Sequence, residues 1–380
     1  MKRYLVSIAV SLLLCAGGFV SVANAKLDGP IRIAVVQDLT GPTSVIGIGE
    51  KNAAVLAAEQ LNNSGLLENA KIELIVEDSR GTKEGAVNAF QKVISRDKVV
   101  AIFGPTLTVQ GFPAHPIAQK AGVPTVSASN VGKGITAIGE YIFVTSTPEY
   151  KLMIPNLVDT VYPKLQAKRV AAIQAKDQDW CIDAVAAYAK AFKSKGVELL
   201  GVETFITGET NYLAQLNKIK ELKPDAIIVA ALFQDSGLIM SQAREIGIPA
   251  SVPFLGTVGM NNPKTVELAG KAAEGALFGT TWHPSAPGTV SQKFVADFRA
   301  KFSAAPDHFS AQAYDAMLML GHAIRNANTT TDRKAIRDAM ANLKGVPGVL
   351  GEPIRFDGER HLVAKPFVLK IHNGKFERYE

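Results

Sequence analysis

The sequence contains very little cysteine. Its 380 residues include only Cys15 and Cys181, and Cys15 lies in an N-terminal segment that we expect to be removed. The mature chain then keeps a single thiol, which excludes an internal disulfide. Aromatic residues are also few, at 7%, while hydrophobic residues make up 47% of the chain. That composition is typical of a globular protein, and the length favours two domains.

A strong excess of one charge is also missing. The formal net charge is +6, and losing Lys2 and Arg3 with the N-terminal segment lowers it to +4. The remaining basic residues are scattered, and we find no basic run with interleaved aromatic residues. The sequence therefore gives no support for a nucleic-acid partner.

Long apolar runs are confined to residues 1–25. A basic start, an apolar run and small residues before Lys26 follow the order of a secretory signal peptide. A retained membrane anchor is the alternative, but the apolar run is short and is broken by Gly17-Gly18. Lipidation of Cys15 is disfavoured by the leucine before it. We therefore predict a mature chain from about Lys26 in the periplasm.

Catalytic motifs are scarce as well. The "GIG" at 47–49 starts like a dinucleotide fingerprint, but Asn52 stands where the third glycine belongs. There is no G-x-S-x-G, and the six histidines are dispersed without H-E-x-x-H. The "DQDWCID" at 177–183 lacks the glycine and distal glutamate of a calcium loop, and a helix start explains it better. We predict no catalytic residue, no metal and no cofactor, with a secreted hydrolase as the enzyme alternative.

What the sequence does contain is a regular alternation of strands and helices. Short apolar segments alternate with segments whose apolar residues recur at helical spacing, which predicts an α/β fold with parallel sheets covered on both faces. The expected strands are 31–39, 71–78, 99–104, 168–174, 198–205 and 224–233, and the expected helices are 48–63, 83–96, 182–195 and 211–222.

This alternation occurs twice. "IRIAVVQ" at 31–37 is similar to "KRVAAIQ" at 168–174, and "IAQKAGVPTVSAS" at 117–129 is similar to "SQAREIGIPASVPF" at 241–254. Two similar lobes are the simplest account. Because ligands of open parallel sheets lie beyond the carboxyl ends of the strands, we expect a cleft between the two lobes.

Hydroxyl side chains follow two expected strand ends of the first lobe. Thr106 and Thr108 follow "VVAIFGP", and Ser127 and Ser129 belong to "GVPTVSAS". Hydroxyls beside free N–H groups at a helix start form a neutral cradle that suits a carboxylate. The alternative is that these residues only cap helices.

The chain resembles the Leu/Ile/Val-binding protein branch of the type I periplasmic binding proteins, the extracytoplasmic receptors of ABC importers. The resemblance covers nearly the whole mature chain. It rests on "IAVVQDLTGPTSVIG", "AAEQLNNSG", "IVEDSRGTKEGAVNAFQKVI", "VVAIFGPTLT", "AGVPTVSAS", "PDAIIVAALFQDSGLIMSQAREIGI" and "FSAQAYDAMLML".

The resemblance implies a Venus-flytrap fold with three crossovers. The first lobe would hold 26–146 and 282–345, and the second 147–281 and 346–380. It also implies a small-molecule ligand, a membrane permease as partner, no catalysis and a monomer. Closure of the lobes would be the signal that the permease reads. A sensory receptor domain for a membrane signalling partner is the alternative use of such lobes.

The resemblance also implies ligand contacts. The family holds the ligand carboxylate after the third and fourth strands, and its second lobe closes an aromatic residue over the ligand. The matching positions are Thr108, which we expect to be the principal side chain, Ser129, Asn130 and Val131 for the carboxylate, and Ile46 and Trp180 for the rest of the ligand.

Departures from the family pattern concern the ligand ammonium. Family members that bind amino acids hold it with an acidic residue, and the matching position is Val258; a tyrosine position is matched by Leu232, followed by Phe233. Asp235 could replace the acid from further along the loop. An unpaired ammonium in a closed cleft would cost several kcal/mol. We therefore expect a largely apolar carboxylate without an ammonium, against Leu232, Phe233, Val258, Trp180 and Tyr150, with leucine-like amino acids as the alternative.

Overall fold

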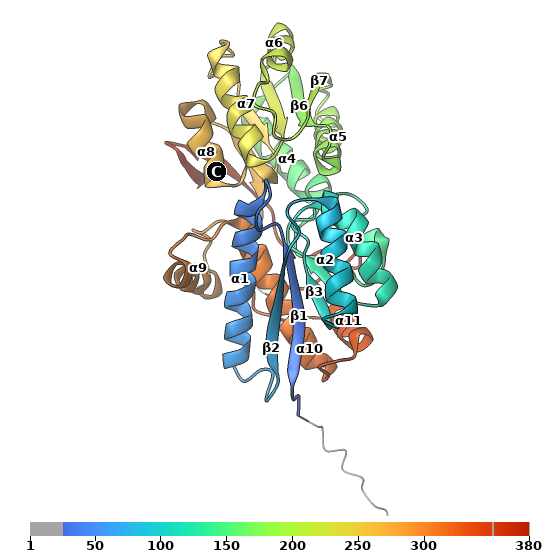
Figure 1. Ribbon diagram of the computed structural model, residues 1–380. Coiled ribbons are helices and arrows are strands. Elements are labelled where there is room, and N and C mark those ends of the chain that lie inside the picture. Colours follow the sequence, from blue (N-terminus) through green and yellow to red (C-terminus); the bar gives the residue numbers. More distant parts are fainter. Residues whose placement is uncertain (1–25, 352, 380) are drawn as a thin grey trace, which may run out of the picture.

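The computed structural model describes residues 26–351 and 353–379, which form two lobes stacked end to end (Figure 1). The predicted signal peptide lies outside the described residues. As the sequence predicts, the fold is α/β, and each lobe is built on one sheet with helices on both faces.

The first lobe, lower in Figure 1, contains a five-stranded parallel sheet in the order β2-β1-β3-β4-β5. Its helices pack on the two faces, and α1 lies along α10, which comes from far later in the chain. Its elements are β1 (Pro30–Gln37), α1 (Ser44–Asn63), β2 (Lys71–Asp78), α2 (Lys83–Ser95), β3 (Ala101–Phe103), α3 (Thr108–Ala121), β4 (Thr125–Ser127), η1 (Thr136–Ile138), β5 (Ile142–Val144), α9 (Thr289–Phe302), α10 (His308–Ala327) and α11 (Arg333–Ala341).

The second lobe contains a seven-stranded sheet in the order β12-β11-β10-β9-β8-β6-β7. Its strands from β10 to β7 are parallel, and β11 and β12 extend the sheet antiparallel at one edge. Its elements are η2 (Glu149–Met153), α4 (Ile154–Leu165), β6 (Val170–Ala175), α5 (Asp179–Lys193), β7 (Leu199–Phe205), α6 (Leu213–Glu221), β8 (Ala226–Ala230), α7 (Phe233–Glu245), β9 (Phe254–Gly256), η3 (Val258–Met260), α8 (Pro263–Ala269), η4 (Gly270–Ala273), β10 (Leu277–Thr280), β11 (Phe367–His372) and β12 (Lys375–Arg378).

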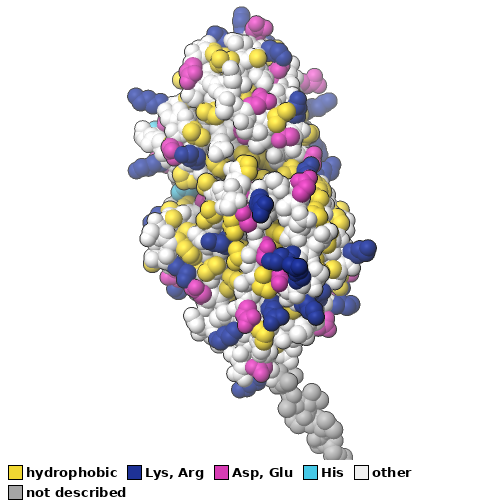
Figure 2. Space-filling model, in the orientation of Figure 1, with side chains coloured by type: hydrophobic (Ala, Val, Ile, Leu, Met, Phe, Trp, Pro, Cys, Tyr) yellow, Lys and Arg dark blue, Asp and Glu magenta, His cyan; other side chains and the backbone are white. Residues whose placement is uncertain are grey.

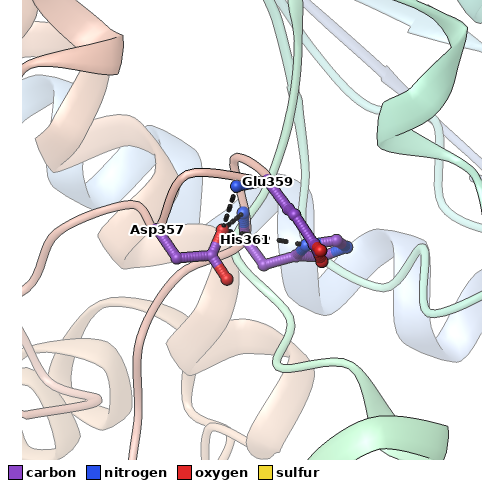
Figure 3. A group of neighbouring side chains, drawn as sticks. All are labelled: Asp357, Glu359 and His361. Carbon is purple, nitrogen blue, oxygen red and sulfur yellow. Dashed lines mark hydrogen bonds and ion pairs between the residues drawn. The ribbon is translucent and has the colours of Figure 1, made fainter.

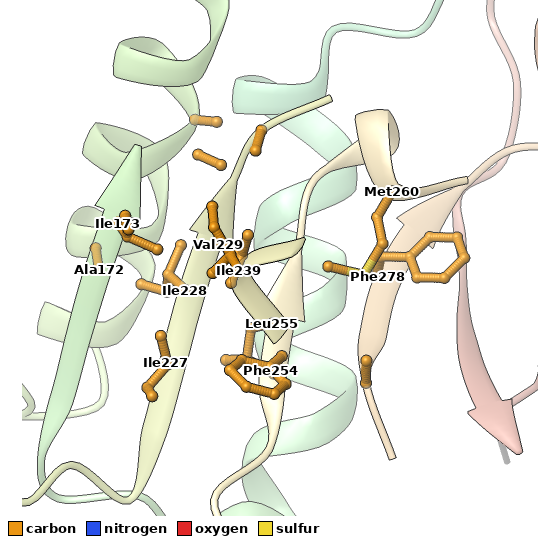
Figure 4. Close-up of a cluster of buried hydrophobic side chains, with 14 of the residues drawn as sticks. Ala172, Ile173, Ile227, Ile228, Val229, Ile239, Phe254, Leu255, Met260 and Phe278 are labelled. Carbon is orange, nitrogen blue, oxygen red and sulfur yellow. The ribbon is translucent and has the colours of Figure 1, made fainter. Parts of the chain in front are cut away.

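The central strands are buried on both faces, which explains why their sequences are apolar without alternation. Residues 226–230 of β8, "AIIVA", are all buried. Figure 4 shows the side chains of β6, β8 and β9 packed together in the core of the second lobe. The predicted strand over 224–233 ends early, because Phe233 already begins α7.

The chain passes between the lobes at three places. Residues 145–148 lead from β5 of the first lobe to η2 of the second, and residues 281–288 lead from β10 of the second lobe to α9 of the first. Between α11 and β11, residues from Val346 to Ala364 pack in the hydrophobic core of the first lobe, and Phe143 contacts Phe356. The division predicted at 345/346 remains a prediction, and this packing favours a crossing after Ala364.

The outside of the molecule is mixed in character. On the face shown in Figure 2, basic and acidic side chains are interspersed over both lobes. Within the described ranges, every helix is too short or too polar to cross a membrane.

Candidate ligand-binding site

The carboxyl ends of the parallel strands of both lobes meet at the junction between the lobes. A small central cavity of about 20 Å³ lies there, close to the volume that one water molecule needs. The lobes are therefore closed against each other at this point. The cavity is lined by Ile46, Leu107, Ser129, Val131, Trp180, Leu232, Val258, Gly259 and Phe309.

Six of the sequence-predicted residues line this central cavity. They are Ile46, Ser129, Val131, Trp180, Leu232 and Val258. The sequence analysis missed Leu107, Gly259 and Phe309. Phe309 is the first residue of "FSAQAYDAMLML", so the motif was present in the sequence but was not assigned to the site. Gly259 is needed for close packing, because a Cβ there would lie 2.9 Å from Cη2 of Trp180.

Most of the lining residues stand at the start of a helix, and α1, α3, α5 and α7 each begin a few residues after a strand ends. Leu107 and Leu232 precede the first residues of α3 and α7, and Trp180 and Phe309 are the second residues of α5 and α10. Ile46 lies in the first turn of α1, and Val258 is the first residue of η3. Helix N-termini carry partial positive charge, so their convergence favours an anion in the cavity.

Ser129 is the only polar side chain among the described residues that line the central cavity. Its hydroxyl donates a hydrogen bond to Oε1 of Glu50, a fully buried residue of α1. Burial raises the pKa of the Glu50 carboxyl well above its usual range, and Asp307 and Asp38 act in the same direction. Burial therefore favours the uncharged form of the Glu50 carboxyl.

Thr108 lies beside the cavity and holds the loop that follows β4. Its Oγ1 accepts hydrogen bonds from the backbone N–H groups of Val131 (3.1 Å) and Gly132 (3.2 Å). Thr108 is 1% exposed, and Gly132 approaches so closely that a Cβ there would meet Thr108 Cγ2 at 2.3 Å. Thr108 therefore positions Val131, and its proton remains available as a donor.

Thr106 lies inside the first lobe. It is fully buried, donates to Gln37 Oε1 (2.7 Å) and accepts from the N–H of Asp38 (2.9 Å). These bonds connect the ends of β1 and β3, and they use the Thr106 hydroxyl both as a donor and as an acceptor. The structure does not bring Thr106 to the central cavity, although the sequence pattern treats it like Thr108.

Three other predicted residues lie away from the central cavity. Asn130 is buried and donates to the carbonyl oxygen of Pro105 (2.7 Å). Phe233 belongs to the second-lobe core and borders a side cavity. Tyr150 borders a different cavity beside α5, with Lys133 from the first lobe. A direct ligand contact remains a prediction for each of them.

An acidic side chain lies behind the second-lobe wall. Oε1 of Glu149 accepts a hydrogen bond from the N–H of Val258 (2.5 Å), and its Oε2 is buried without a hydrogen-bond partner. Burial raises the pKa of Glu149 from 4.5 to about 8. Asp235, by contrast, is engaged within the second lobe, where its Oδ1 accepts from Tyr212 (2.6 Å) and Gly208 (2.9 Å).

The cleft continues on both sides of the central cavity. On the α7 side, a cavity of about 270 Å³ shares Leu107 and Leu232 with it. On the α10 side, a cavity of about 430 Å³ lies between residues of both lobes, including Val45, Asn262 and Asp307. A small ligand therefore has space to extend once the lobes separate.

Comparison with known proteins gives consistent matches along the chain. The sequence model described as periplasmic binding protein matches residues 30–375. The chain is 25% identical over 335 residues to Leu/Ile/Val-binding protein homolog 3 of Brucella melitensis, covering 88% of each sequence.

Solved structures show the same architecture. A leucine-binding protein of Thermotoga maritima has a TM-score of 0.84 at 27% identity. The substrate-binding protein of a branched-chain amino acid transporter from Streptococcus pneumoniae, in complex with isoleucine, has a TM-score of 0.83 at 28% identity. Each match covers 92% of this chain and 98% of the other chain.

Proposed function

This chain belongs to the periplasmic binding protein family, and we propose that it is the solute receptor of an ABC importer for a small, largely apolar carboxylate. Members of the family are substrate-binding proteins that work with membrane permeases, and the predicted signal peptide would place this one outside the cytoplasm. The convergence of helix N-termini on the central cavity carries the ligand proposal.

These helix starts distinguish an anion from a cation. The lining side chains among the described residues carry no formal charge. The partial positive charges at the starts of α3, α5, α7 and α10 stabilise a carboxylate and disfavour an ammonium group at the same position. Glu50 supports this choice, because an uncharged Glu50 does not repel a carboxylate beside Ser129.

The apolar side chains that line the rest of the cavity favour an apolar ligand. Ile46, Leu107, Val131, Leu232 and Val258 surround the cavity with aliphatic groups, and Trp180 and Phe309 add two aromatic rings. Such walls gain free energy by burying a ring or a branched alkyl group. We therefore propose an aromatic acid, an aliphatic acid or a 2-oxo acid as the ligand.

Binding of a leucine-like amino acid is the second candidate, and Glu149 is the observation that favours it. Its carboxyl group lies directly behind Val258, with one oxygen unpartnered. A nearby ammonium group would favour the ionised form of Glu149. Glu149 could then take the role of the acidic residue that amino-acid binders of the family carry at the position of Val258. The names of several relatives point the same way.

A binding screen separates these two candidates. The mature chain is tested by thermal shift and then by calorimetry with benzoate, 4-methyl-2-oxopentanoate and leucine. Leucine and its 2-oxo acid differ only at the α-carbon, so their comparison isolates the ammonium group. We expect the 2-oxo acid or the aromatic acid to raise the melting temperature. A large shift with leucine and none with either acid would overturn the carboxylate proposal.

A further inference from the structure

Three metal-ligating side chains meet on a turn at the third connection between the lobes. Asp357, Glu359 and His361 each offer a ligand atom, and these atoms lie within 4.8 Å of one another (Figure 3). In the sequence they occupy alternate positions of "DGERH". None of the three residues lines the central cavity.

The backbone holds this turn rigidly. The N–H of Asp357 donates to the carbonyl oxygen of His361 (2.8 Å), and Asp357 Oδ1 accepts from the N–H groups of Glu359 and His361. Val144, at the end of β5, exchanges backbone hydrogen bonds with Arg360 (3.0 Å) and Leu362 (2.8 Å). The backbone that carries the three side chains is therefore held in place before any ligand arrives, which lowers the entropy lost on binding.

His361 points to a ligand independently of the two carboxylates. It is only 6% exposed, and its Nδ1 has no hydrogen-bond partner. This nitrogen lies 4.0 Å from Asp357 Oδ1, inside the cluster. An unpartnered buried polar atom costs free energy, and a bound group that fills the coordination position of Nδ1 removes that cost.

The charges around His361 suit a cation. Asp357 and Glu359 are acidic, and Lys151 and Arg360 are the basic groups that act on the ring. Arg360 turns its guanidinium away, toward the carbonyl oxygens of Ile142 and Thr136. A neutral imidazole is a common metal ligand, and Nδ1 of His361 is the nitrogen that lies inside the cluster.

We propose that Asp357, Glu359 and His361 form a binding site for a divalent transition-metal ion of the Zn²⁺ class. One imidazole nitrogen and two carboxylate oxygens match the ligand preferences of Zn²⁺, with water completing the coordination. Metal–ligand distances of about 2.0–2.2 Å require the three groups to move closer together. Glu359 can supply much of that movement, because its side chain is 59% exposed.

Lys151 is the competitor for this site. Its Nζ lies 2.9 Å from Oε2 of Glu359, and it comes from η2, at the start of the second lobe. A bound cation would replace Lys151 as the partner of Glu359. Metal binding should therefore be weakened by Lys151 and strengthened by its removal, an effect that a purely structural role of Glu359 would not produce.

Isothermal titration of the untagged mature chain with ZnCl₂ tests the site. We expect one bound equivalent, a loss of affinity of at least about tenfold in Glu359→Gln and in His361→Gln, and a clear gain in Lys151→Met. Glu274→Gln is the matched control, because Glu274 forms an exposed pair with His372 (2.7 Å) and belongs to no such cluster. Affinity in Glu359→Gln equal to that of the wild type would overturn the proposal, and so would weaker binding in Lys151→Met.

A parallel titration with CaCl₂ tests the role of the imidazole. Because Ca²⁺ prefers oxygen ligands, we expect it to bind much more weakly than Zn²⁺. Equal affinity for the two ions, unaffected by His361→Gln, would reject the proposed ligand set. Because the Glu359 side chain is exposed, Glu359→Gln should fold and still test the site if His361→Gln does not fold.

Discussion

The hydroxyl of Ser129 donates a hydrogen bond to Glu50, so the one polar side chain among the described residues on the wall of the central cavity is bonded to a fully buried acid. The direction of this bond decides what Ser129 offers a ligand. When Glu50 is protonated, the acid can instead donate to Ser129 Oγ, which frees the serine proton for a ligand carboxylate. When Glu50 is ionised, the serine proton is held and a negative charge lies below the ligand.

The pH dependence of acid binding should therefore depend on Glu50. Burial raises the Glu50 pKa, so the uncharged form dominates at low pH and the affinity for a carboxylate should fall as rising pH ionises Glu50. In Glu50→Gln the amide stays uncharged and can donate to Ser129. Calorimetry at a series of rising pH values should show a decline in the wild type and a flatter profile in the variant. Identical profiles would contradict the coupling.

Thr108→Val should weaken both folding and ligand binding. The substitution removes the acceptor for the N–H groups of Val131 and Gly132, which should lower the free energy of unfolding by about 1–3 kcal/mol. Because Val131 lines the cavity, ligand affinity should fall as well. Thr108→Ser keeps the hydroxyl and is the matched control. Lower stability with unchanged affinity would show that Thr108 serves the loop alone.

The structure modifies the sequence-based expectation for Thr108. The sequence analysis made it the principal ligand contact, and the structure gives its oxygen two loop partners. The strand-and-hydroxyl pattern does not distinguish Thr106 from Thr108, since both follow the same strand at alternate positions, and only the family resemblance favours Thr108. In the structure, the bond to Gln37 holds Thr106 inside the first lobe, whereas Thr108 lies beside the cavity.

The architecture was more predictable than the site because it follows from local patterns. Apolar runs of strand length and the internal repeat are visible in the sequence and were sufficient for two parallel-sheet lobes. The position of Phe309 depends on how α10 packs against β3 and β4, more than 180 residues earlier in the chain. Glu149 bonds to Val258, which lies 109 residues later in the chain, a contact that no spacing in the sequence indicates.

Glu149 should make stability depend on pH. Its pKa is 4.5 in the unfolded chain and about 8 in the folded one, so the folded state binds the extra proton between these values. The contribution of this proton to the free energy of unfolding is fully present below about pH 4.5. It decreases by up to about 1.4 kcal/mol per pH unit as the pH rises toward about 8. Urea denaturation at about pH 5 and pH 8 should show a smaller difference in Glu149→Gln than in the wild type. The exposed Glu274→Gln should keep the wild-type difference.

Trp180 should report ligand binding by fluorescence. The chain has two tryptophans, and Trp282 is fully buried in the first-lobe core, where its Nε1 donates to Ser291 (2.9 Å). Trp282→Phe leaves Trp180 as the only tryptophan, at the wall of the central cavity. We expect a saturable change in emission when a binding acid is added to this variant. Emission that stays constant while calorimetry records binding would place the ligand elsewhere.

Val258→Glu should shift the ligand preference from acids to amino acids. The new side chain would project from the cavity wall, while the backbone N–H of Val258 keeps its bond to Glu149. An added carboxylate repels a bound acid and supplies the missing partner for an ammonium, so affinity for the acid should fall at least about tenfold while affinity for leucine increases. Val258→Gln adds the same bulk without the charge and should lower the affinity for both. Equal behaviour of the two variants in calorimetry would show that shape rather than charge at this position determines the ligand.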